Sequence, residues 1–164
     1  NEMVEDFIDF DLHAENPQAV VLGDMGNLFT FELLNALFKK ILNGAEIVAM
    51  HKNKYWHSGN GLALDLGAFV AALEFATEKD AVVIGKPNPH LFQLAVKPWG
   101  LSFQSIYMVG DDIRGDIGGA NNVGMQSILV KTGKYREESL KRSEITPDFI
   151  INSVADLPEL LQLN

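Results

Sequence analysis

Three carboxylates stand close together in one short stretch of the sequence. Asp111 and Asp112 follow the apolar segment 105–109 after a single glycine, and Asp116 comes four residues after Asp112. In open α/β sheets, ligands bind at the carboxyl ends of strands, which is where these residues would lie. Adjacent carboxylates repel each other unless a cation compensates, and hard oxygen ligands suit Mg²⁺. The cluster therefore predicts a magnesium site at Asp111, Asp112 and Asp116, although the last two alone would also fit a helix N-terminus whose dipole they complement.

A lysine precedes this acidic stretch by one strand–helix unit. Lys86 follows the apolar run 82–84 within Gly85-Lys86-Pro87, so a glycine and a rigid proline flank it. Its ammonium group can neutralise a phosphate or a carboxylate, which a site for phosphoryl transfer needs. Most lysines are solvated, so Lys86 alone indicates little. Together with the three carboxylates it predicts a catalytic and substrate-binding role.

Alternating strands and helices must position these residues. Short apolar runs predict strands, and apolar residues at helical spacing predict helices. Such alternation is typical of an α/β fold with a mostly parallel sheet and helices packed on it. We expect strands at 19–22, 46–50, 81–84, 105–109, 127–130 and 148–151, helices at 29–41, 69–76, 88–96, 113–122 and 154–163, and a polar loop at 51–61.

The composition limits the classes of partner. The chain has 164 residues, enough for one domain or two small ones, and a formal net charge of −9, which would repel nucleic acid and anionic membranes. It has no cysteine, so it has neither a disulfide nor a thiolate nucleophile. No apolar stretch reaches the length of a transmembrane helix. We therefore expect a cytoplasmic protein that binds neither nucleic acid nor membranes.

The segments that carry Lys86 and the three carboxylates resemble a known family. Gly-Lys-Pro at 85–87 and Gly-Asp-Asp-Ile-Arg-Gly-Asp at 110–116 are similar to the third and fourth motifs of the haloacid-dehalogenase-like (HAD) phosphatases. Val-Lys-Thr-Gly-Lys-Tyr at 130–135 and the segment 27–40 resemble the p-nitrophenylphosphatase-like branch. The resemblance implies a Rossmann-like parallel-sheet core, of which only the C-terminal part is present, an inserted α/β cap domain, Mg²⁺ as cofactor and a small phosphorylated substrate.

The resemblance also implies a role for each matching residue. Asp111 matches the carboxylate that binds Mg²⁺ directly, whereas Asp112 and Asp116 match positions that hold metal-bound water or orient the site. Lys86 matches the lysine that stabilises the nucleophilic aspartate and the phosphoryl group. Asn53, in the predicted cap loop, is a weaker candidate for substrate binding. The implied division is a connector at 1–16, a cap domain at 17–80 and the C-terminal half of the core at 81–164.

Two motifs of the family are not found, and one of them is the second motif's Ser or Thr after a strand. The first motif, Asp-x-Asp-Gly-Thr after an apolar strand, supplies the nucleophile. The segment 21–28 imitates it with Asp24, but Gly26 replaces the second aspartate. We therefore expect Asp24 to be a cap residue, the nucleophile to lie in a missing N-terminal segment, and the chain alone to be inactive. Without its central neighbour, the strand at 105–109 would keep an unpaired edge, from which we expect a homo-oligomer.

Two other functions compete with an aspartate-nucleophile phosphatase. A truncated, catalytically silent homologue would act as a binding or dimerisation module. A receiver-like domain would also combine acidic residues, Mg²⁺ and a lysine, but its acidic pair should follow the first strand and not a late one. The sequence thus favours the phosphatase, with the silent module as the alternative.

Overall fold

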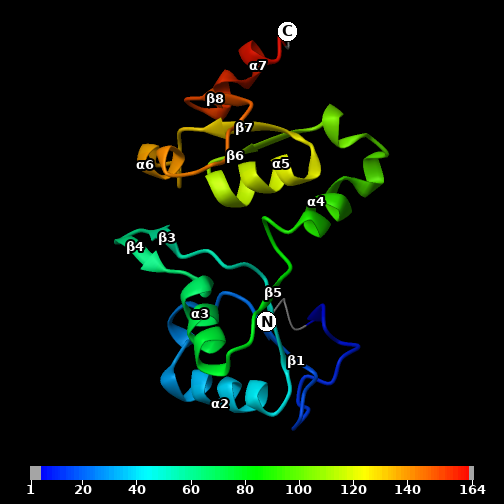
Figure 1. The fold of residues 1–164 in the computed structure, drawn as a ribbon, viewed down its shortest axis with the longest axis vertical. Helices are drawn as coiled ribbons and strands as arrows, with labels where there is room; N and C mark the ends of the chain where they lie inside the picture. Colours follow the sequence, from blue (N-terminus) through cyan, green and yellow to red (C-terminus); the bar gives the residue numbers. More distant parts are fainter. Residues whose placement is uncertain (1–4, 163–164) are drawn as a thin grey trace. The chain divides into compact units, whose positions relative to one another are not determined.

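The computed structural model describes residues 5–162, in which elements of both kinds alternate along the chain (Figure 1). The chain divides into two units, each with its own sheet. Unit 1 comprises Asn1–Tyr55 and Leu64–Val83, and unit 2 comprises Trp56–Ala63 and Ile84–Asn164. Among the described residues, no helix is both long enough and apolar enough to span a membrane.

Unit 1 is built on a parallel sheet with the strand order β1-β2-β5, formed by Ala19–Leu22, Glu46–Ala49 and Val82–Val83. The helices α2 (Phe31–Leu42) and α3 (Leu66–Thr77) pack on each other. Each begins at a side-chain N-cap, which satisfies a backbone N–H that has no partner within the helix. The buried core consists of apolar side chains from β1, β2, α2, α3 and the turn before β2: Val20, Leu22, Ile41, Ala45, Ile47, Ala49, Leu66, Val70 and Leu73.

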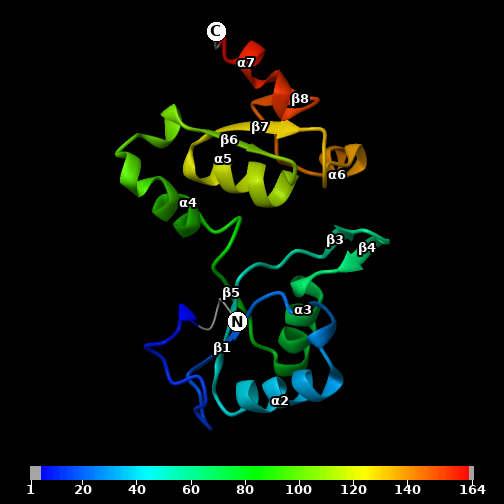
Figure 2. The ribbon, with the colours of Figure 1, turned by 180° about the vertical axis from the view of Figure 1, so that it is seen from behind.

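Unit 2 contains a second parallel sheet with the order β6-β7-β8, formed by Tyr107–Gly110, Gln126–Val130 and Phe149–Ile151. Gly110, the last residue of β6, pairs with Leu129 of β7. A π-helical turn (η4, Ile113–Gly118) continues into α5 (Gly119–Val123), and Figure 2 shows this run alongside β6 and β7. The other helices are α4 (Pro89–Val96), α6 (Glu137–Lys141) and α7 (Leu157–Leu160), with 3-10 turns at Gly26–Leu28, Lys97–Trp99, Phe103–Ser105 and Val154–Asp156.

Two clusters of buried side chains fix the helices of unit 2 on its sheet. Phe92 and Val96 of α4 pack with Ala120 of α5 on one side. Ile117 and Leu129, neither exposed to solvent, pack with the partly buried residues of 135–145 on the other. Burying such side chains stabilises the fold by roughly 1.5–3 kcal/mol each. The turn that follows β6 is therefore held from both sides.

The structure confirms the α/β class and the parallel sheets, and it corrects several predicted elements. The predicted strand 81–84 shrinks to Val82–Val83, and the predicted helix 113–122 begins as a π-helical turn. The final helix is a 3-10 turn followed by Leu157–Leu160, and the predicted end at residue 163 lies outside the described residues. The helix Glu137–Lys141 was not predicted, because its apolar face is only one residue wide.

The expected polar loop at 51–61 is wrong, because most of it forms a β-hairpin. Strand β3 (Tyr55–Ser58) and strand β4 (Gly61–Leu64) flank the two residues Gly59 and Asn60. A two-residue turn of Gly and Asn between runs of β-forming residues is a hairpin signal. Gly61 has a φ of +108°, which a residue with a side chain rarely adopts. The sequence therefore contained the signal, and polarity alone was the wrong criterion.

Candidate active site

The three carboxylates lie within six residues of the end of β6, as the sequence predicted, but each has different hydrogen-bond partners. Asp112 is the N-cap of the π-helical turn: its Oδ1 accepts the backbone N–H groups of Arg114 and Gly115, both at 3.0 Å. These are two of the N–H groups that a helix start leaves without partners. Asp112 therefore caps the N-terminus of this helical turn, which is the structural role that the sequence also allowed for it.

Asp116 lies one turn later and forms the best-defined ion pair of the site. Its Oδ1 lies 2.6 Å from Nζ of Lys86, thirty residues earlier in the chain. Its Oδ2 accepts the backbone N–H of Asp112 at 3.1 Å. Asp116 is 5% exposed, whereas the Lys86 side chain is 48% exposed, so the carboxylate is buried and the ammonium group reaches solvent. A buried carboxylate is stable only with such partners.

Gly110 makes room for this buried carboxylate. A Cβ atom at position 110 would overlap the side chain of Asp116, including its Cβ and Cγ atoms. Gly115 is different, because a Cβ there would lie 3.4 Å from Cγ of Asp112, which is an ordinary contact. Of these two glycines in the same motif, close packing therefore requires glycine only at position 110.

Asp111 receives a hydrogen bond from the loop after the neighbouring strand. Its Oδ2 accepts the backbone N–H of Lys134 at 2.7 Å. Gly133, with a φ of +51°, approaches this oxygen so closely that no Cβ would fit. The Lys134 ammonium group also lies 3.9 Å from Oδ2 of Asp112. Lys134 and Gly133 are therefore site residues that reasoning from the sequence missed.

A signal for these two residues was present in the sequence. Lys-Thr-Gly-Lys at 131–134 directly follows the buried strand β7, which is parallel to β6 and adjacent to it. Loops that follow parallel neighbouring strands emerge at the same edge of the sheet. The loop after β7 must therefore lie beside Asp111, and its glycine and lysines were candidates on that ground.

The free carboxylate oxygens decide which residue can bind a cation. Within residues 5–162, no group of three or more acidic or histidine side chains is arranged to hold a metal ion. Asp116 is engaged by Lys86, and one oxygen of Asp112 is engaged by two N–H groups. No donor in the described part of the chain contacts Oδ1 of Asp111, which leaves this oxygen for a ligand. This donor set fits Mg²⁺, which keeps several waters and takes one or two carboxylates directly.

Two further residues that the sequence singled out belong to unit 1. Asp24 is exposed after β1 and accepts the backbone N–H of Gly26 at 3.0 Å, which is a local turn. Asn53 is half-buried, and its backbone oxygen accepts the N–H of Gly67 at 2.9 Å. The contacts within unit 1 give neither side chain a chemical role, so the suggested role of Asn53 in substrate binding stays a prediction.

Comparisons with known proteins point to one family. Residues 83–157 match the HAD-hydrolase-like family model. The chain is 46% identical over 125 residues to haloacid dehalogenase-like hydrolase domain-containing protein 2 from Bos taurus, covering 76% of this chain and 48% of that protein. It is 34% identical over 163 residues to phospholysine phosphohistidine inorganic pyrophosphate phosphatase from Xenopus laevis, covering 98% and 60%. The chain thus spans about half the length of the curated relatives it matches.

Solved structures give the same result. A 4-nitrophenylphosphatase from Thermotoga maritima superposes with a TM-score of 0.83 at 31% identity, over 96% of this chain and 60% of that one. A glycerol phosphate phosphatase from Mycobacterium tuberculosis, solved in complex with magnesium, superposes with a TM-score of 0.77 at 32% identity, over 87% and 43%. The resemblance found in the sequence motifs is confirmed: this chain is similar to the HAD-like hydrolases, and the relatives and solved structures that it matches include phosphatases, among them a 4-nitrophenylphosphatase.

Proposed function

We propose that this chain provides the cap and the C-terminal half of the core of a Mg²⁺-dependent phosphatase that acts on small phosphomonoesters. The reaction would pass through an aspartyl-phosphate intermediate, which divides one difficult displacement into two easier ones. The nucleophilic aspartate and the general acid/base would come from an upstream segment with the sequence Asp-x-Asp-Gly-Thr. In this proposal the chain supplies the groups that compensate charge, and not the nucleophile.

The observation that carries the proposal is the contact between Lys86 and Asp116. An ammonium group that is half exposed, fixed at 2.6 Å by a buried carboxylate, is held in one place while it still faces solvent. Phosphoryl transfer requires positive charge fixed in advance beside the equatorial oxygens. Lys86 would stabilise the incoming phosphoryl group and the nucleophile, while Asp116 would hold Lys86 in position.

The remaining carboxylates would form the magnesium site. Asp111 would bind the ion directly through Oδ1, and Asp112 and Asp116 would orient the site and the water around the ion. Bound Mg²⁺ supplies charge compensation for the phosphoryl oxygens. The magnesium complex of the related glycerol phosphate phosphatase supports this choice of ion, and that protein's substrate is itself a small phosphomonoester. Lys134 would keep Asp111 in its rotamer through the bond to Oδ2.

The proposed division of the chain follows the family's organisation. Residues 17–80 would be the cap that selects the substrate, with Asn53 as a candidate contact, and 81–164 would be core. We also propose a cytoplasmic location and a homo-oligomer, and we propose that neither nucleic acid nor a membrane is a partner. The net charge of −9 supports the last point, since both surfaces are anionic.

The proposal is tested by Mg²⁺-dependent hydrolysis of p-nitrophenyl phosphate. The 164-residue chain alone should hydrolyse this substrate no faster than buffer, whereas the protein with its upstream segment should turn it over. In that longer protein, Asp111→Asn should lower turnover by at least about 100-fold, because even the loss of an outer-shell partner of a metal costs about 10–100-fold. Asp24→Asn is the matched control, since it removes a strand-end carboxylate of unit 1, and it should leave turnover within about twofold.

The alternative function has a distinct outcome in the same assay. If the longer protein is folded but inactive with every phosphomonoester tried, a silent binding or dimerisation module is the better description. Robust turnover by the 164-residue chain alone, in a preparation verified by intact mass, would instead require a nucleophile within the chain. Asp24 would then be the first residue to reconsider, because it follows a strand as the family's nucleophile does.

A further inference from the structure

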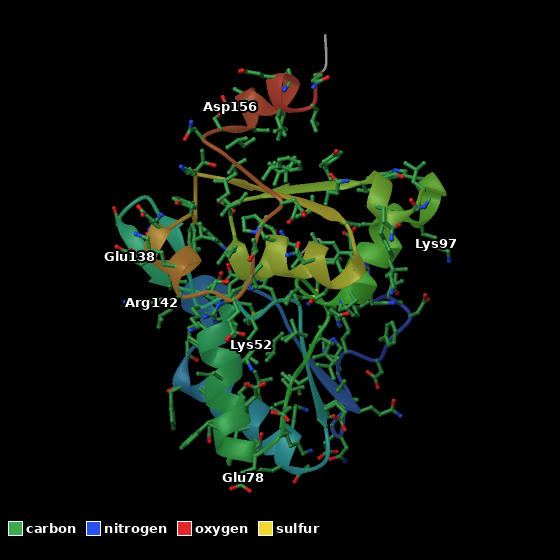
Figure 3. All side chains as sticks on the ribbon, turned by 45° about the horizontal axis from the view of Figure 1, so that its top comes forward. Lys52, Glu78, Lys97, Glu138, Arg142 and Asp156 are labelled. Atoms are coloured by element: carbon green, nitrogen blue, oxygen red, sulfur yellow. The ribbon has the colours of Figure 1, made fainter. Side chains whose placement is uncertain are left out.

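A cavity of about 770 Å³ opens within unit 2, between the helical run η4–α5 and the segment that follows α6. Arg114, Gly118 and Asn121 line it from the helical run, and Arg142 and the residues up to Thr146 line it from the segment. Figure 3 labels Arg142 at the end of α6. The cavity is therefore lined by the helical run η4–α5 and by the segment after α6, which are about one strand–helix unit apart in the sequence.

The wall opposite the helical run is fixed in place. A Cβ atom on Gly118 would lie 2.8 Å from Cδ1 of Ile145, so the end of the Ile145 side chain packs closely over this glycine. Ile145 packs on the buried cluster that includes Ile117. The Asn121 side chain donates a hydrogen bond to the backbone oxygen of Thr146 at 2.9 Å. Apolar packing and a hydrogen bond thus form the cavity before any ligand arrives, which lowers the cost of binding.

Two arginine side chains at this cavity have no partner among the described residues. The chain has three arginines, and Arg136 donates to the backbone oxygens of Gly133 and Tyr135. Within residues 5–162, neither Arg114 nor Arg142 forms an ion pair or a side-chain hydrogen bond, although the chain has 22 acidic residues against 13 basic ones. Acidic side chains are therefore abundant, yet the two guanidinium groups at this cavity pair with none of them and are available to bind a ligand.

The chemistry of the lining indicates the class of ligand. A guanidinium group offers a planar fork of N–H donors that matches a phosphate or carboxylate bidentately. The Ser143 hydroxyl, which accepts the N–H of Ile145 at 2.9 Å, keeps its proton for donation. Glu144 also lines the cavity, so the charged lining residues are two arginines and one carboxylate. A net positive lining rich in donors selects an anion.

Neither Asp116 nor Lys86 is among the residues that line the cavity, and Pro87, which follows Lys86, is the lining residue next to that pair. Residues two apart on a helical turn project from roughly opposite sides, so Arg114 and Gly118, each two residues from Asp116, lie on the other side of the run from its side chain. Asp116 and Lys86 are engaged with each other on the side that Asp116 occupies. We propose that the cavity is a separate anion site, in which Arg114 and Arg142 bind the phosphate group of a small phosphorylated ligand.

The probe for this site is inorganic pyrophosphate, titrated calorimetrically into the chain at low salt and without divalent cations. We expect saturable binding of one pyrophosphate. Arg114→Gln and Arg142→Gln should each weaken it by about tenfold or more, since each removes hydrogen bonds that are charge-assisted. Glu144→Gln should strengthen it, because it removes the carboxylate of the lining. Both arginines are exposed, so circular dichroism should show that the variants remain folded.

Two control variants keep the test specific. Lys97→Gln removes an exposed charge of the same unit that is not among the lining residues, and Figure 3 labels this lysine apart from Arg142. It should change the affinity by less than about twofold, as expected for a distant surface charge. Lys131→Gln, which removes another exposed charge of unit 2 outside the lining, should also leave the affinity unchanged. A loss with either control equal to that of the arginine variants, or no saturable binding at all, would overturn the proposal.

Discussion

Gly110→Ala should destabilise unit 2 far more than Gly115→Ala, although both glycines belong to the same motif. The methyl group at position 110 would overlap the Asp116 side chain, which is 5% exposed and has no free space to enter. Asp116 would have to move, and its hydrogen bonds to Lys86 and to the N–H of Asp112 would break. The prediction thus concerns one methyl group and the buried carboxylate behind it.

The magnitude follows from these contacts. Overpacking costs about 1–3 kcal/mol, and a lost hydrogen bond to a charged group costs about 1.5–3 kcal/mol. The Lys86 contact is discounted because its ammonium group is half exposed, which leaves about 3–4 kcal/mol in total. Gly115→Ala meets only an ordinary contact and gains about 0.5–1 kcal/mol from the lower backbone entropy of alanine, so it should be neutral or slightly stabilising.

Hydrogen exchange measured by mass spectrometry can read the two units separately. For a unit of this size, a loss of 3–4 kcal/mol corresponds to a fall of at least about 10 °C in unfolding temperature. Peptides from β6 and β7 should lose protection in Gly110→Ala and keep it in Gly115→Ala, while those from β1 and β2 serve as internal controls. Equal protection of β6 in both variants would refute the packing argument, because the carboxylate would then have moved without cost.

Three further predictions concern two side-chain hydrogen-bond contacts and the unpaired edge of strand β6. Ser127 is fully buried and exchanges hydrogen bonds with Asp148, so Ser127→Ala should lower the free energy of unfolding by about 1–3 kcal/mol; the exposed Ser105→Ala is the control, and equal effects would contradict this reasoning. Thr30 caps α2 by accepting the N–H of Leu33, so Thr30→Ala should cost about 1 kcal/mol and Thr30→Ser almost nothing in chemical denaturation; a costly serine would mean that the methyl group matters instead. Within residues 5–162, β6 pairs only with β7, so the chain should sediment as an oligomer; a monomer with fully protected β6 amides would rule this out.

Much of the fold could be predicted, because its signals are local. The predicted strands 19–22, 46–50 and 127–130 are mostly apolar, and they became the parallel strands Ala19–Leu22, Glu46–Ala49 and Gln126–Val130. Asn88-Pro89 became the N-cap and first residue of α4, since the side chain and ring act on their own backbone. The hairpin at 55–64 was missed although its turn residues were visible, because the polarity of the segment was given too much importance.

The candidate site also has features that the sequence predicted and features that only the tertiary structure shows. The sequence by itself determined that Asp111, Asp112 and Asp116 follow a strand, and that a lysine follows another strand one unit earlier. Only the tertiary structure decided that Lys86 pairs with Asp116, and that Lys134 holds Asp111. These contacts join residues 30 and 23 positions apart. The order of strands in the sheet brings these residues together, and Gly110 and Gly133 leave the space for the contacts. The spacing of residues along the sequence predicts neither the strand order nor this space.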